Sequence, residues 1–426
     1  MTEQEKREAR IRILTLSWEY PPHKIGGIAE HVYELSKALV RRGLGVHVIT
    51  LGDFLYEKNE GVYLYRIAVD ASKPDFITCM NEEMKIIGAL VIESTNIDVI
   101  HAHDWMVANA ALDLAFRYRK PLVATIHSTE FGRSQGITED YQMRIHRVEE
   151  RLVKSSNHVI VCSESMKREL QGLFGAKAEI SVIPNGIDTL KFEFFLDREA
   201  IKERFCGQSN TKLILFVGRL VYQKGVNVLI GALPIILSSY PEGKRNVKLV
   251  IVGEGPMRKQ LERDAAYLGI SKQVVFTGYQ DDYTVISLLK AADVVVVPSL
   301  YEPFGIVALE AMAAKTPVVA SDVGGLSGLI NAEESVKVPP DNSEILAEGI
   351  VNVLSDTEEC KKRVAVMVEK GFKKALSLNW DKVSEVTIGV YATVLARAST
   401  AITARGEDIN IEIGTERGEK WEYTYS

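Results

Sequence analysis

Short apolar runs alternate with helical patterns along the whole chain. The first run, Ile11–Leu16, is followed by a turn with two prolines and two glycines, a helical pattern over Ile28–Arg42 and a second apolar run over Val46–Leu51. A strand, a glycine-rich turn, a helix and a strand in this order form the βαβ unit of a parallel sheet. Ligands of such sheets normally bind outside the carboxyl ends of the strands.

The alternation continues and then restarts, which predicts two domains. In the first half, strands are expected at Asp98–Ala102, Leu122–Ile126 and His158–Cys162, each separated by a helical stretch. The elements expected in the second half are strand Leu213–Val217, helix Val226–Ser238, strand Val247–Val252, helix Met257–Leu268, strands Val274–Thr277 and Val294–Pro298, helix Ile306–Ala314 and strand Pro317–Ser321. We therefore predict an α/β fold of two doubly wound, Rossmann-like domains that face each other across a cleft.

Breaks in the periodicity set the predicted boundaries. Ser181–Phe192 contains a proline and an Asn-Gly pair, which is typical of a linker. A long helical pattern, Lys382–Ala396, follows a completed sheet and is expected to return to the first domain. The prediction is an N-terminal domain over residues 1–188, a C-terminal domain over 189–380, a C-terminal helix over 381–402 that packs on the N-terminal domain, and a polar tail over 403–426.

Composition narrows the classes of function. A length of 426 residues favours two domains over one. The net charge of −6 and the lack of a long Lys/Arg block argue against a nucleic-acid partner. No apolar run reaches the roughly 18 residues of a transmembrane segment, and the charged N-terminus does not resemble a signal peptide, so we expect a cytoplasmic protein. The four cysteines form no C-x-x-C pair and are expected to be reduced thiols. The sequence leaves a homo-oligomer open.

A basic, glycine-containing turn follows the first strand of the second half. Gly218 and Arg219 come directly after this strand, and Lys224-Gly225 precedes a helix. Two cations beside a helix N-terminus are suited to bind a pyrophosphate, because the N–H groups and the helix dipole add to the side-chain charges. The alternative is a solvated basic turn.

A second turn, Tyr301–Glu310, carries two carboxylates eight residues apart. Glu302 lies in a Pro/Gly turn after an apolar strand, and Glu310 lies on the following helix. Gly305 permits close approach of the backbone to a ligand, so a sugar and a phosphate could share this turn. The alternative is an acid that merely favours the helix dipole.

Three histidines occur at strand ends in the first half. His101 and His103 point to the same side of their strand, as a pair of metal ligands would. No third ligand cluster supports a metal, so we predict no metal site and expect both rings to line the cleft. His127 follows the next strand and is expected to face the crevice at its carboxyl end.

The segment Gly253-Glu254-Gly255 is a fragment of a dinucleotide fingerprint without a third glycine. It fits a tight turn beside a nucleotide base, on which the ring of Tyr279 could stack. The alternative for Tyr279 is loop packing.

The combined motifs resemble the retaining glycosyltransferases of family 4, whose two-domain fold is called GT-B. The segments that carry the resemblance are SWEYPP (Ser17–Pro22), Gly26-Gly27, HAHDW (His101–Trp105), IPNGID (Ile183–Asp188) and Trp380. The Glu302…Glu310 motif with Glu-Pro-Phe-Gly is the most specific. Within the family, the first segments are similar to glycogen and starch synthases, although the acceptor loops look shorter than in large starch synthases.

The resemblance implies a role for each matching residue. The catalytic residues would be Glu302, His127, Arg219, Lys224 and Asp104, with Asp104 on the acceptor side. The donor diphosphate would contact Lys24, Gly26, Gly27, Arg219, Lys224, Gly305, Ile306 and Val307. The sugar would contact His127, Glu302, Pro303 and Phe304, and the ribose Glu310, with Gly253 and Tyr279 near the base.

The function so predicted is that of a hexosyltransferase that moves glucose from ADP-glucose or UDP-glucose onto a glucan through an α-1,4 linkage. It would need no cofactor besides the nucleotide-sugar donor. Alternatives are synthesis of trehalose or sucrose, lipid mannosylation, glycoside hydrolysis, sugar-nucleotide epimerisation and non-catalytic sugar binding. The two carboxylates alone would suit a hydrolase, but a hydrolase needs no pair of cations for a diphosphate.

Overall fold

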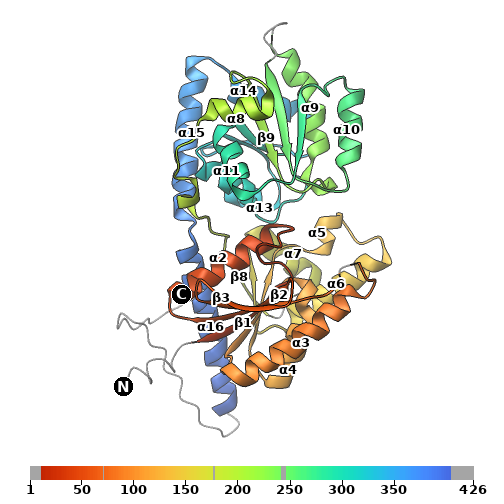
Figure 1. Cartoon of the computed structure of the whole chain (residues 1–426), viewed down its shortest axis with the longest axis vertical. Helices are drawn as coiled ribbons and strands as arrows, with labels where there is room; N and C mark the ends of the chain where they lie inside the picture. Colours follow the sequence, from red (N-terminus) through yellow and green to blue (C-terminus); the bar gives the residue numbers. More distant parts are fainter. Residues whose placement is uncertain (1–10, 71, 176–177, 241–245, 404–426) are drawn as a thin grey trace. The chain divides into compact units, whose positions relative to one another are not determined.

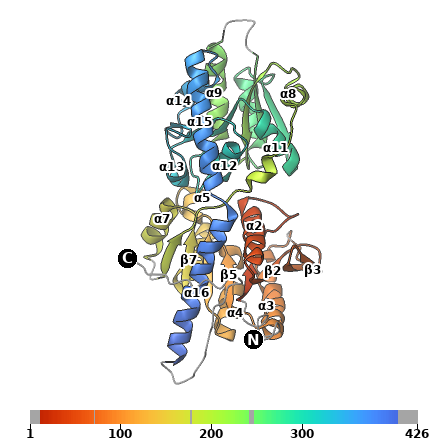
Figure 2. The ribbon, with the colours of Figure 1, turned by 90° about the vertical axis from the view of Figure 1, so that its left-hand side faces the viewer.

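The computed structural model describes residues 11–70, 72–175, 178–240 and 246–403, which form two compact units (Figures 1 and 2). Within these ranges the first unit comprises residues up to Val161, Lys167–Ile183 and the chain from Trp380 onward. The second unit comprises Cys162–Met166 and Pro184–Asn379. Apart from the short segment Cys162–Met166, the chain leaves the first unit after Ile183 and re-enters it at Trp380, whereas the sequence predicted boundaries after residues 188 and 380.

The first unit is built on one eight-stranded sheet in the order β3-β4-β2-β1-β5-β6-β7-β8. Its strands are β1 (Arg12–Leu16), β2 (Gly45–Leu51), β3 (Leu55–Asn59), β4 (Val62–Ile67), β5 (Val99–His103), β6 (Leu122–Ile126), β7 (His158–Val161) and β8 (Glu179–Val182). All neighbours are parallel except β3 and β4. Because β1 lies between β2 and β5, the strand order reverses there, and this switch point is where open sheets bind ligands.

Helices alternate with these strands. They are α2 (Gly27–Arg41), α3 (Phe76–Thr95), α4 (Ala108–Tyr118), α5 (Glu130–Ser134), α6 (Asp140–Ser155), α7 (Glu164–Phe174) and α16 (Trp380–Thr403), with one 3₁₀ turn, Trp105–Val107. Strands β5 and β6 are buried at every position. Strands covered on both faces read as continuous apolar runs, which is why the sequence located them closely.

The C-terminal helix α16 packs on the first unit, as the sequence predicted. The Tyr391 side chain is fully buried, and its hydroxyl lies 2.7 Å from Nδ1 of His101 on β5. At the start of α16, Asp381 pairs with Arg41 of α2 at 3.1 Å. The helix is longer than predicted, because it begins at Trp380 and continues to Thr403. The predicted tail beyond Thr403 lies outside the described residues.

The second unit is a six-stranded parallel sheet in the order β11-β10-β9-β12-β13-β14. Its strands are β9 (Lys212–Val217), β10 (Val247–Val252), β11 (Val274–Gly278), β12 (Val294–Val297), β13 (Val318–Ser321) and β14 (Val336–Val338). Its helices are α8 (Arg198–Cys206), α9 (Val226–Ser238), α10 (Arg258–Tyr267), α11 (Asp282–Ala291), α12 (Ile306–Ala313), α13 (Gly324–Leu329), α14 (Ser343–Leu354) and α15 (Glu358–Ser377). Here the order reverses between β9 and β12. Two predicted doubly wound sheets are therefore confirmed.

Part of the predicted linker is regular structure. Ser181 and Val182 close strand β8 at the edge of the first sheet, and Thr189–Phe192 forms a 3₁₀ turn. Strand β8 contains only four residues, and its pairing with β7 stabilises it. The extended linker over Ser181–Phe192 was therefore predicted too long.

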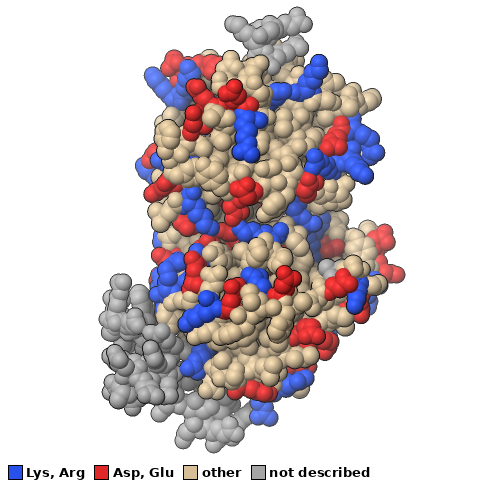
Figure 3. All heavy atoms as spheres, in the orientation of Figure 1, with Lys and Arg blue, Asp and Glu red and all other residues tan. Residues whose placement is uncertain are grey.

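Three further observations bear on the predictions from composition. The four cysteines are free, and three of them are buried. Lys and Arg side chains are interspersed with Asp and Glu on the face drawn in Figure 3, as a net charge of −6 without charge blocks predicts. None of the described helices has both the length and the apolar character needed to cross a membrane.

The hydrogen bond between Tyr391 and His101 generates a prediction for stability. Tyr391→Phe removes the hydroxyl and leaves a buried imidazole nitrogen without its partner, which costs about 1–3 kcal/mol. Urea unfolding followed by Trp fluorescence measures the loss in the first unit, where Trp18, Trp105 and Trp380 lie. Tyr56→Phe is the control, since Tyr56 is 59% exposed, and its stability should not change. Equal stability of the two variants would contradict the prediction.

Candidate functional site

The site in the second unit lies at the carboxyl ends of β9 and β12, where the strand order reverses. The backbones of the two loops touch there. The carbonyl of Gln223 accepts the N–H groups of Leu300 and Tyr301 at 2.8 and 3.2 Å. At Gly225, with φ of +64°, a Cβ atom would lie 2.0 Å from the Pro298 carbonyl oxygen. Only glycine fits this contact, and the contact fixes the position of Lys224.

Lys224 and Glu302 form an ion pair across this switch point. The Lys224 Nζ lies 2.6 Å from Glu302 Oε2, which also accepts the Ser299 hydroxyl at 3.1 Å. The Glu302 side chain is 11% exposed, whereas that of Lys224 is 28% exposed. The structure thus brings together one predicted cation and the first predicted carboxylate, although they are 78 residues apart in the sequence.

Arg219 lies in the loop after β9, at the point where this loop packs against the loop after β10. A Cβ atom at Gly253 would lie 2.0 Å from the Gly218 carbonyl oxygen, so the two loops pack backbone to backbone. Arg219 is exposed, and none of the ion pairs found among the described residues includes it. Tyr279 follows β11, the next strand, and is 66% exposed. The side chain of Arg219 is therefore available to an anion at this edge of the sheet.

Helix α12 begins directly after the Glu302 turn. Gly305 precedes it with φ of +101°, and the first hydrogen bonds run from the N–H groups of Ala308 and Leu309 to the Gly305 carbonyl. The N–H groups of Ile306 and Val307 therefore come before the first bond within the helix, which is the usual position of an anion site.

The rest of the turn is closely packed. The N–H of Gly325 donates to the Glu302 carbonyl at 2.7 Å, and a Cβ atom at Gly325 would lie 1.9 Å from the Pro303 carbonyl. Phe304 is buried, and Glu310 is partly buried on α12. The backbone of the turn is therefore held in place independently of any ligand.

The site in the first unit is a cluster of histidines at its own switch point. His103 ends β5, His127 follows β6, and the third member is His31 of α2, which was not predicted from the sequence. The ligand nitrogens of these three imidazoles all lie within 4.8 Å of one another. His103 Nδ1 and His127 Nε2 form a hydrogen bond of 3.1 Å. His31 could have been found only from the register of α2, which turns it onto the buried face of that helix.

The expected role of His101 and His103 as cleft lining is wrong. Both side chains are 1% exposed, because the sheet is covered on both faces at β5. His101 uses both ring nitrogens inside the unit, one toward Tyr391 and the other toward Thr125 Oγ1 at 2.7 Å. His127 is partly exposed and alone of the predicted histidines can meet a ligand from solvent.

Asp104 is buried and holds the His127 loop. Its Oδ1 accepts the His127 N–H at 2.7 Å, and its own N–H donates to the Thr125 carbonyl at 3.0 Å. The backbone of Asp104 has φ of 61° and ψ of 177°, a region that costs a non-glycine residue a few kcal/mol and occurs mostly at functional sites. Burial raises the pKa of Asp104 to about 6, against the opposing charge of Arg133.

The glycine loop before α2 already has carboxylate partners. Glu19 Oε2 accepts the N–H groups of Ile25 and Gly26 at 2.9 and 2.7 Å, and Lys24 Nζ pairs with Glu30 at 3.2 Å. A Cβ atom at Gly26 or Gly27 would meet no described atom within 4 Å. Packing among the described residues therefore does not require glycine at either position.

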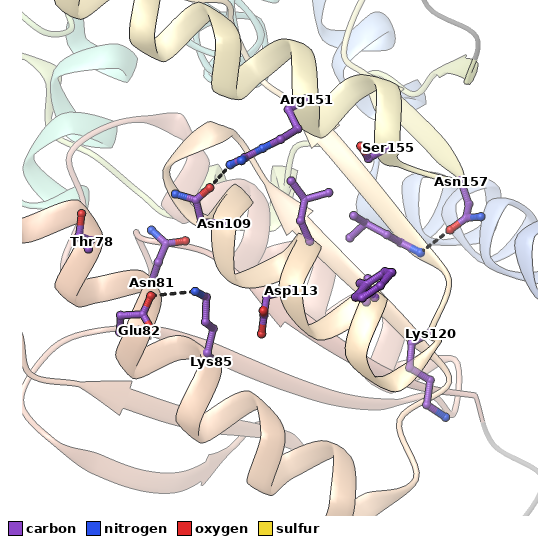
Figure 4. Close-up of a pocket in the computed structure, with 14 residues that line it drawn as sticks. Thr78, Asn81, Glu82, Lys85, Asn109, Asp113, Lys120, Arg151, Ser155 and Asn157 are labelled. Atoms are coloured by element: carbon purple, nitrogen blue, oxygen red, sulfur yellow. Dashed lines mark hydrogen bonds and ion pairs between the residues drawn. The ribbon is translucent and has the colours of Figure 1, made fainter.

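A cavity of about 640 Å³ in the first unit contains none of the predicted site residues (Figure 4). It is bordered by α3, α4 and α6. Many of its polar side chains satisfy one another, as in the pairs Lys85–Glu82 and Arg151–Asn109 drawn in the figure. Its lining residues lie away from the loops at the carboxyl ends of the strands that carry the predicted site residues, so we do not assign it to the site.

Comparison with known proteins adds independent findings. The model of "Glycosyltransferase Family 4" matches residues 25–191, and that of "Glycosyl transferases group 1" matches residues 197–370. An uncharacterised glycosyltransferase of Methanocaldococcus jannaschii is 42% identical over 392 residues, which cover 89% of this chain and 98% of the relative. The glycogen synthase of Mycobacterium tuberculosis is 36% identical over 408 residues, with coverage of 89% and 94%.

A solved structure with the same arrangement of elements is the sucrose-phosphate synthase of Thermosynechococcus elongatus. Its TM-score is 0.78 at 24% identity, and the match covers 91% of this chain and 100% of that one. At this identity the likeness supports the fold alone.

Desolvation of three histidines in the first unit, His101, His103 and His127, leads to a prediction for pH dependence. Burial lowers the pKa of His101 to about 3 and that of His127 to about 4, and it holds the pKa of His103 well below its ordinary range. The rings therefore stay neutral below the ordinary value of 6.5. As the pH falls below 6.5, the unfolded chain binds protons that the folded chain cannot, and the folded state loses stability.

NMR of histidine-labelled protein checks this directly. The ring signals of the three histidines, assigned from single His→Gln variants, should not move between about pH 8 and pH 5.5. A signal assigned to His103 or His127 that titrates with a midpoint near 6.5 would contradict the prediction.

Proposed function

Since this chain belongs to the family 4 glycosyltransferases, with the GT-B fold, we propose that it transfers glucose from ADP-glucose or UDP-glucose to a glucan through an α-1,4 linkage. The observation that carries the proposal is the Lys224–Glu302 pair at the switch point of the second unit. The similarity to a glycogen synthase, at 36% identity over 94% of that protein, supports the choice of acceptor.

The donor diphosphate is bound by the second unit in this proposal. Arg219 and Lys224 supply positive charge, and the N–H groups of Gly305, Ile306 and Val307 supply hydrogen bonds at the start of α12. In the structure, Lys224 neutralises Glu302. A diphosphate would share Lys224 with Glu302, and the exposed Arg219 would contribute a second charge.

The nucleoside and the sugar use the neighbouring loops. Glu310 of α12 accepts the ribose hydroxyls, and the base lies beside Gly253 and the exposed ring of Tyr279. The transferred sugar contacts Glu302 and the Pro303-Phe304 backbone. From the first unit, the predicted contributions are His127 to the sugar, Asp104 to the acceptor side through the His127 loop, and Lys24 with the Gly26-Gly27 loop to the diphosphate.

The proposed chemistry is a substitution with retention at the anomeric carbon. The bond between this carbon and the phosphate oxygen breaks through an oxocarbenium-like transition state. An acceptor hydroxyl forms the new bond from the same face, and its proton passes to the departing phosphate oxygen. The largest requirement is to stabilise the negative charge that develops on the diphosphate, and fixed cations and N–H groups meet it without a metal ion. The carboxylate of Glu302 stabilises the positive charge on the sugar ring.

A small-molecule acceptor is the second candidate. Loops that bind acceptors vary most within a fold, so the shared architecture does not choose between a glucan and an acceptor such as that of sucrose or trehalose synthesis, or a lipid.

The decisive experiment incubates the protein with labelled ADP-glucose or UDP-glucose, with and without glycogen. Label should enter the polymer, and NMR of the product should show an α-1,4 linkage. Label in a small product would support the second candidate, and free glucose alone would contradict transfer.

The ion pair generates a prediction for catalysis. Lys224→Ala should lower kcat by about 100-fold or more, because it removes a preorganised charge from the departing diphosphate. Lys85→Ala is the matched control, since Lys85 pairs with Glu82 at 2.8 Å on α3 and should leave kcat unchanged. Unchanged kinetics in a folded Lys224→Ala protein would remove Lys224 from the site.

Arg219 should behave differently in a stability assay. Because Arg219 is exposed and outside the described ion pairs, Arg219→Ala should leave the melting temperature unchanged but reduce kcat/KM for the nucleotide-sugar by about tenfold or more. Binding of free ADP or UDP, measured by calorimetry, should weaken in parallel. Undiminished nucleotide binding would contradict the assignment of Arg219 to the diphosphate.

A further inference from the structure

Three imidazoles from three different elements converge in the first unit. His31 projects from α2, His103 from the end of β5 and His127 from the loop after β6. The ring centroid of His31 lies 4.7 Å from that of His127 and 5.4 Å from that of His103. One nitrogen from each ring falls within 4.8 Å of the others. The described residues contain no other group of three His, Cys, Asp or Glu side chains that is comparably close.

We propose that His31, His103 and His127 form a binding site for a divalent transition-metal ion of the Zn²⁺ class, and that the bound ion inhibits transfer. Metal binding is inferred from the geometry of the cluster alone. Inhibition by the bound ion rests on the proposed function, in which His127 contacts the sugar.

The distances suit such an ion after small side-chain movements. With metal–nitrogen bonds of about 2.0–2.1 Å, a tetrahedral site places its ligand nitrogens roughly 3.3 Å apart. The His103 and His127 nitrogens are already 3.1 Å apart, so the main movement is that of His31 toward them. Three imidazoles without a carboxylate in the set select Zn²⁺, Co²⁺, Ni²⁺ or Cu²⁺ over Mg²⁺ or Ca²⁺, which prefer oxygen ligands.

The protonation state also suits metal binding. A metal binds the neutral imidazole, and burial keeps His103 and His127 neutral at physiological pH. In the hydrogen bond between these two rings one nitrogen carries a proton. Binding of the ion requires that proton to move to the other nitrogen of the same ring, so no net proton is released from the pair.

The contacts of neighbouring polar side chains explain why these side chains are not among the proposed metal ligands. The rings of His101 and His103 lie tilted to each other with centroids 4.3 Å apart, but Tyr391 and Thr125 occupy both nitrogens of His101. Asp104 holds the His127 backbone, which orients the ring without entering the ligand set. Since His127 is partly exposed, a water molecule can supply the fourth ligand from the solvent side.

Occupancy of this site would affect transfer through His127. A ring nitrogen bound to a metal ion cannot also bond to a sugar hydroxyl, and the ion would hold the ring toward His31 and His103. The ion would therefore inhibit transfer by occupying His127. It would take no part in the chemistry proposed for the second unit, which uses no metal ion.

Direct binding is tested with Co²⁺, whose visible absorption reports tetrahedral nitrogen ligation. The wild-type protein should bind one equivalent with this absorption, and Zn²⁺ should displace it. His31→Gln should raise the Kd by at least about tenfold, whereas the matched control His146→Gln, on α6, should bind as the wild type does. No absorption change up to about 1 mM Co²⁺, or equal binding by the two variants, would overturn the proposal.

Activity is a separate readout. Zn²⁺ should inhibit transfer by the wild-type protein, and EDTA should restore it. The metal-free rate of His31→Gln serves as its own reference, and Zn²⁺ should lower that rate far less than it lowers the wild-type rate, because one of the three ligands is missing. If Zn²⁺ inhibited this variant as strongly as the wild-type protein, inhibition through the histidine cluster would be contradicted. Histidine-dependent Co²⁺ binding in a protein without transferase activity would sustain the metal site and contradict the proposed function, so the two failures are distinguishable.

Discussion

The close contact between Gly225 and the Pro298 carbonyl is the constraint on which the second unit's site depends. It locks the loop after β9 onto the loop after β12, and a Cβ atom at this glycine would lie 2.0 Å from the carbonyl oxygen. Lys224, the preceding residue, is thereby placed opposite Glu302. The cation and the carboxylate come from distant parts of the sequence, yet backbone packing alone brings their positions together. Parallel strands make this general, because all their carboxyl ends lie at one edge of the sheet.

Desolvation has the corresponding role in the first unit. The histidines at the ends of β5 and β6 are kept neutral by burial, and the same burial raises the pKa of Asp104 to about 6. Arg133 opposes this rise, and the hydrogen bond from the His127 N–H favours the ionised carboxylate. The strained backbone of Asp104 is maintained by these contacts. A partly exposed imidazole is therefore held by a buried and rigid framework.

The sequence predicted the architecture well because the central strands β5, β6, β12 and β13 are buried at every position, and their apolar runs are distinctive. It did not predict the β3–β4 hairpin, since Leu55–Asn59 is an exposed, polar edge strand that resembles a loop. In the second unit, Lys224 and Glu302 were both singled out from the loops that follow β9 and β12, and the structure brings their side chains within 2.6 Å. His31 was missed, and His101 was wrongly expected to line the cleft, because neither strand alternation nor motif spacing reports how deeply the end of a strand is covered.

The two units differ in how many of their anion-binding groups are already paired with carboxylates. In the first unit, Glu19 accepts the Gly26 N–H and Glu30 pairs with Lys24, so a diphosphate would have to compete with carboxylates for both. In the second unit, the helix start at Ile306 precedes any intrahelical bond, and Arg219 is exposed. An anion gains more where it replaces water than where it displaces another anion. The readiness of the second unit therefore rests on Arg219 and on the start of α12, because its other cation, Lys224, is paired with Glu302 just as Lys24 is paired with Glu30.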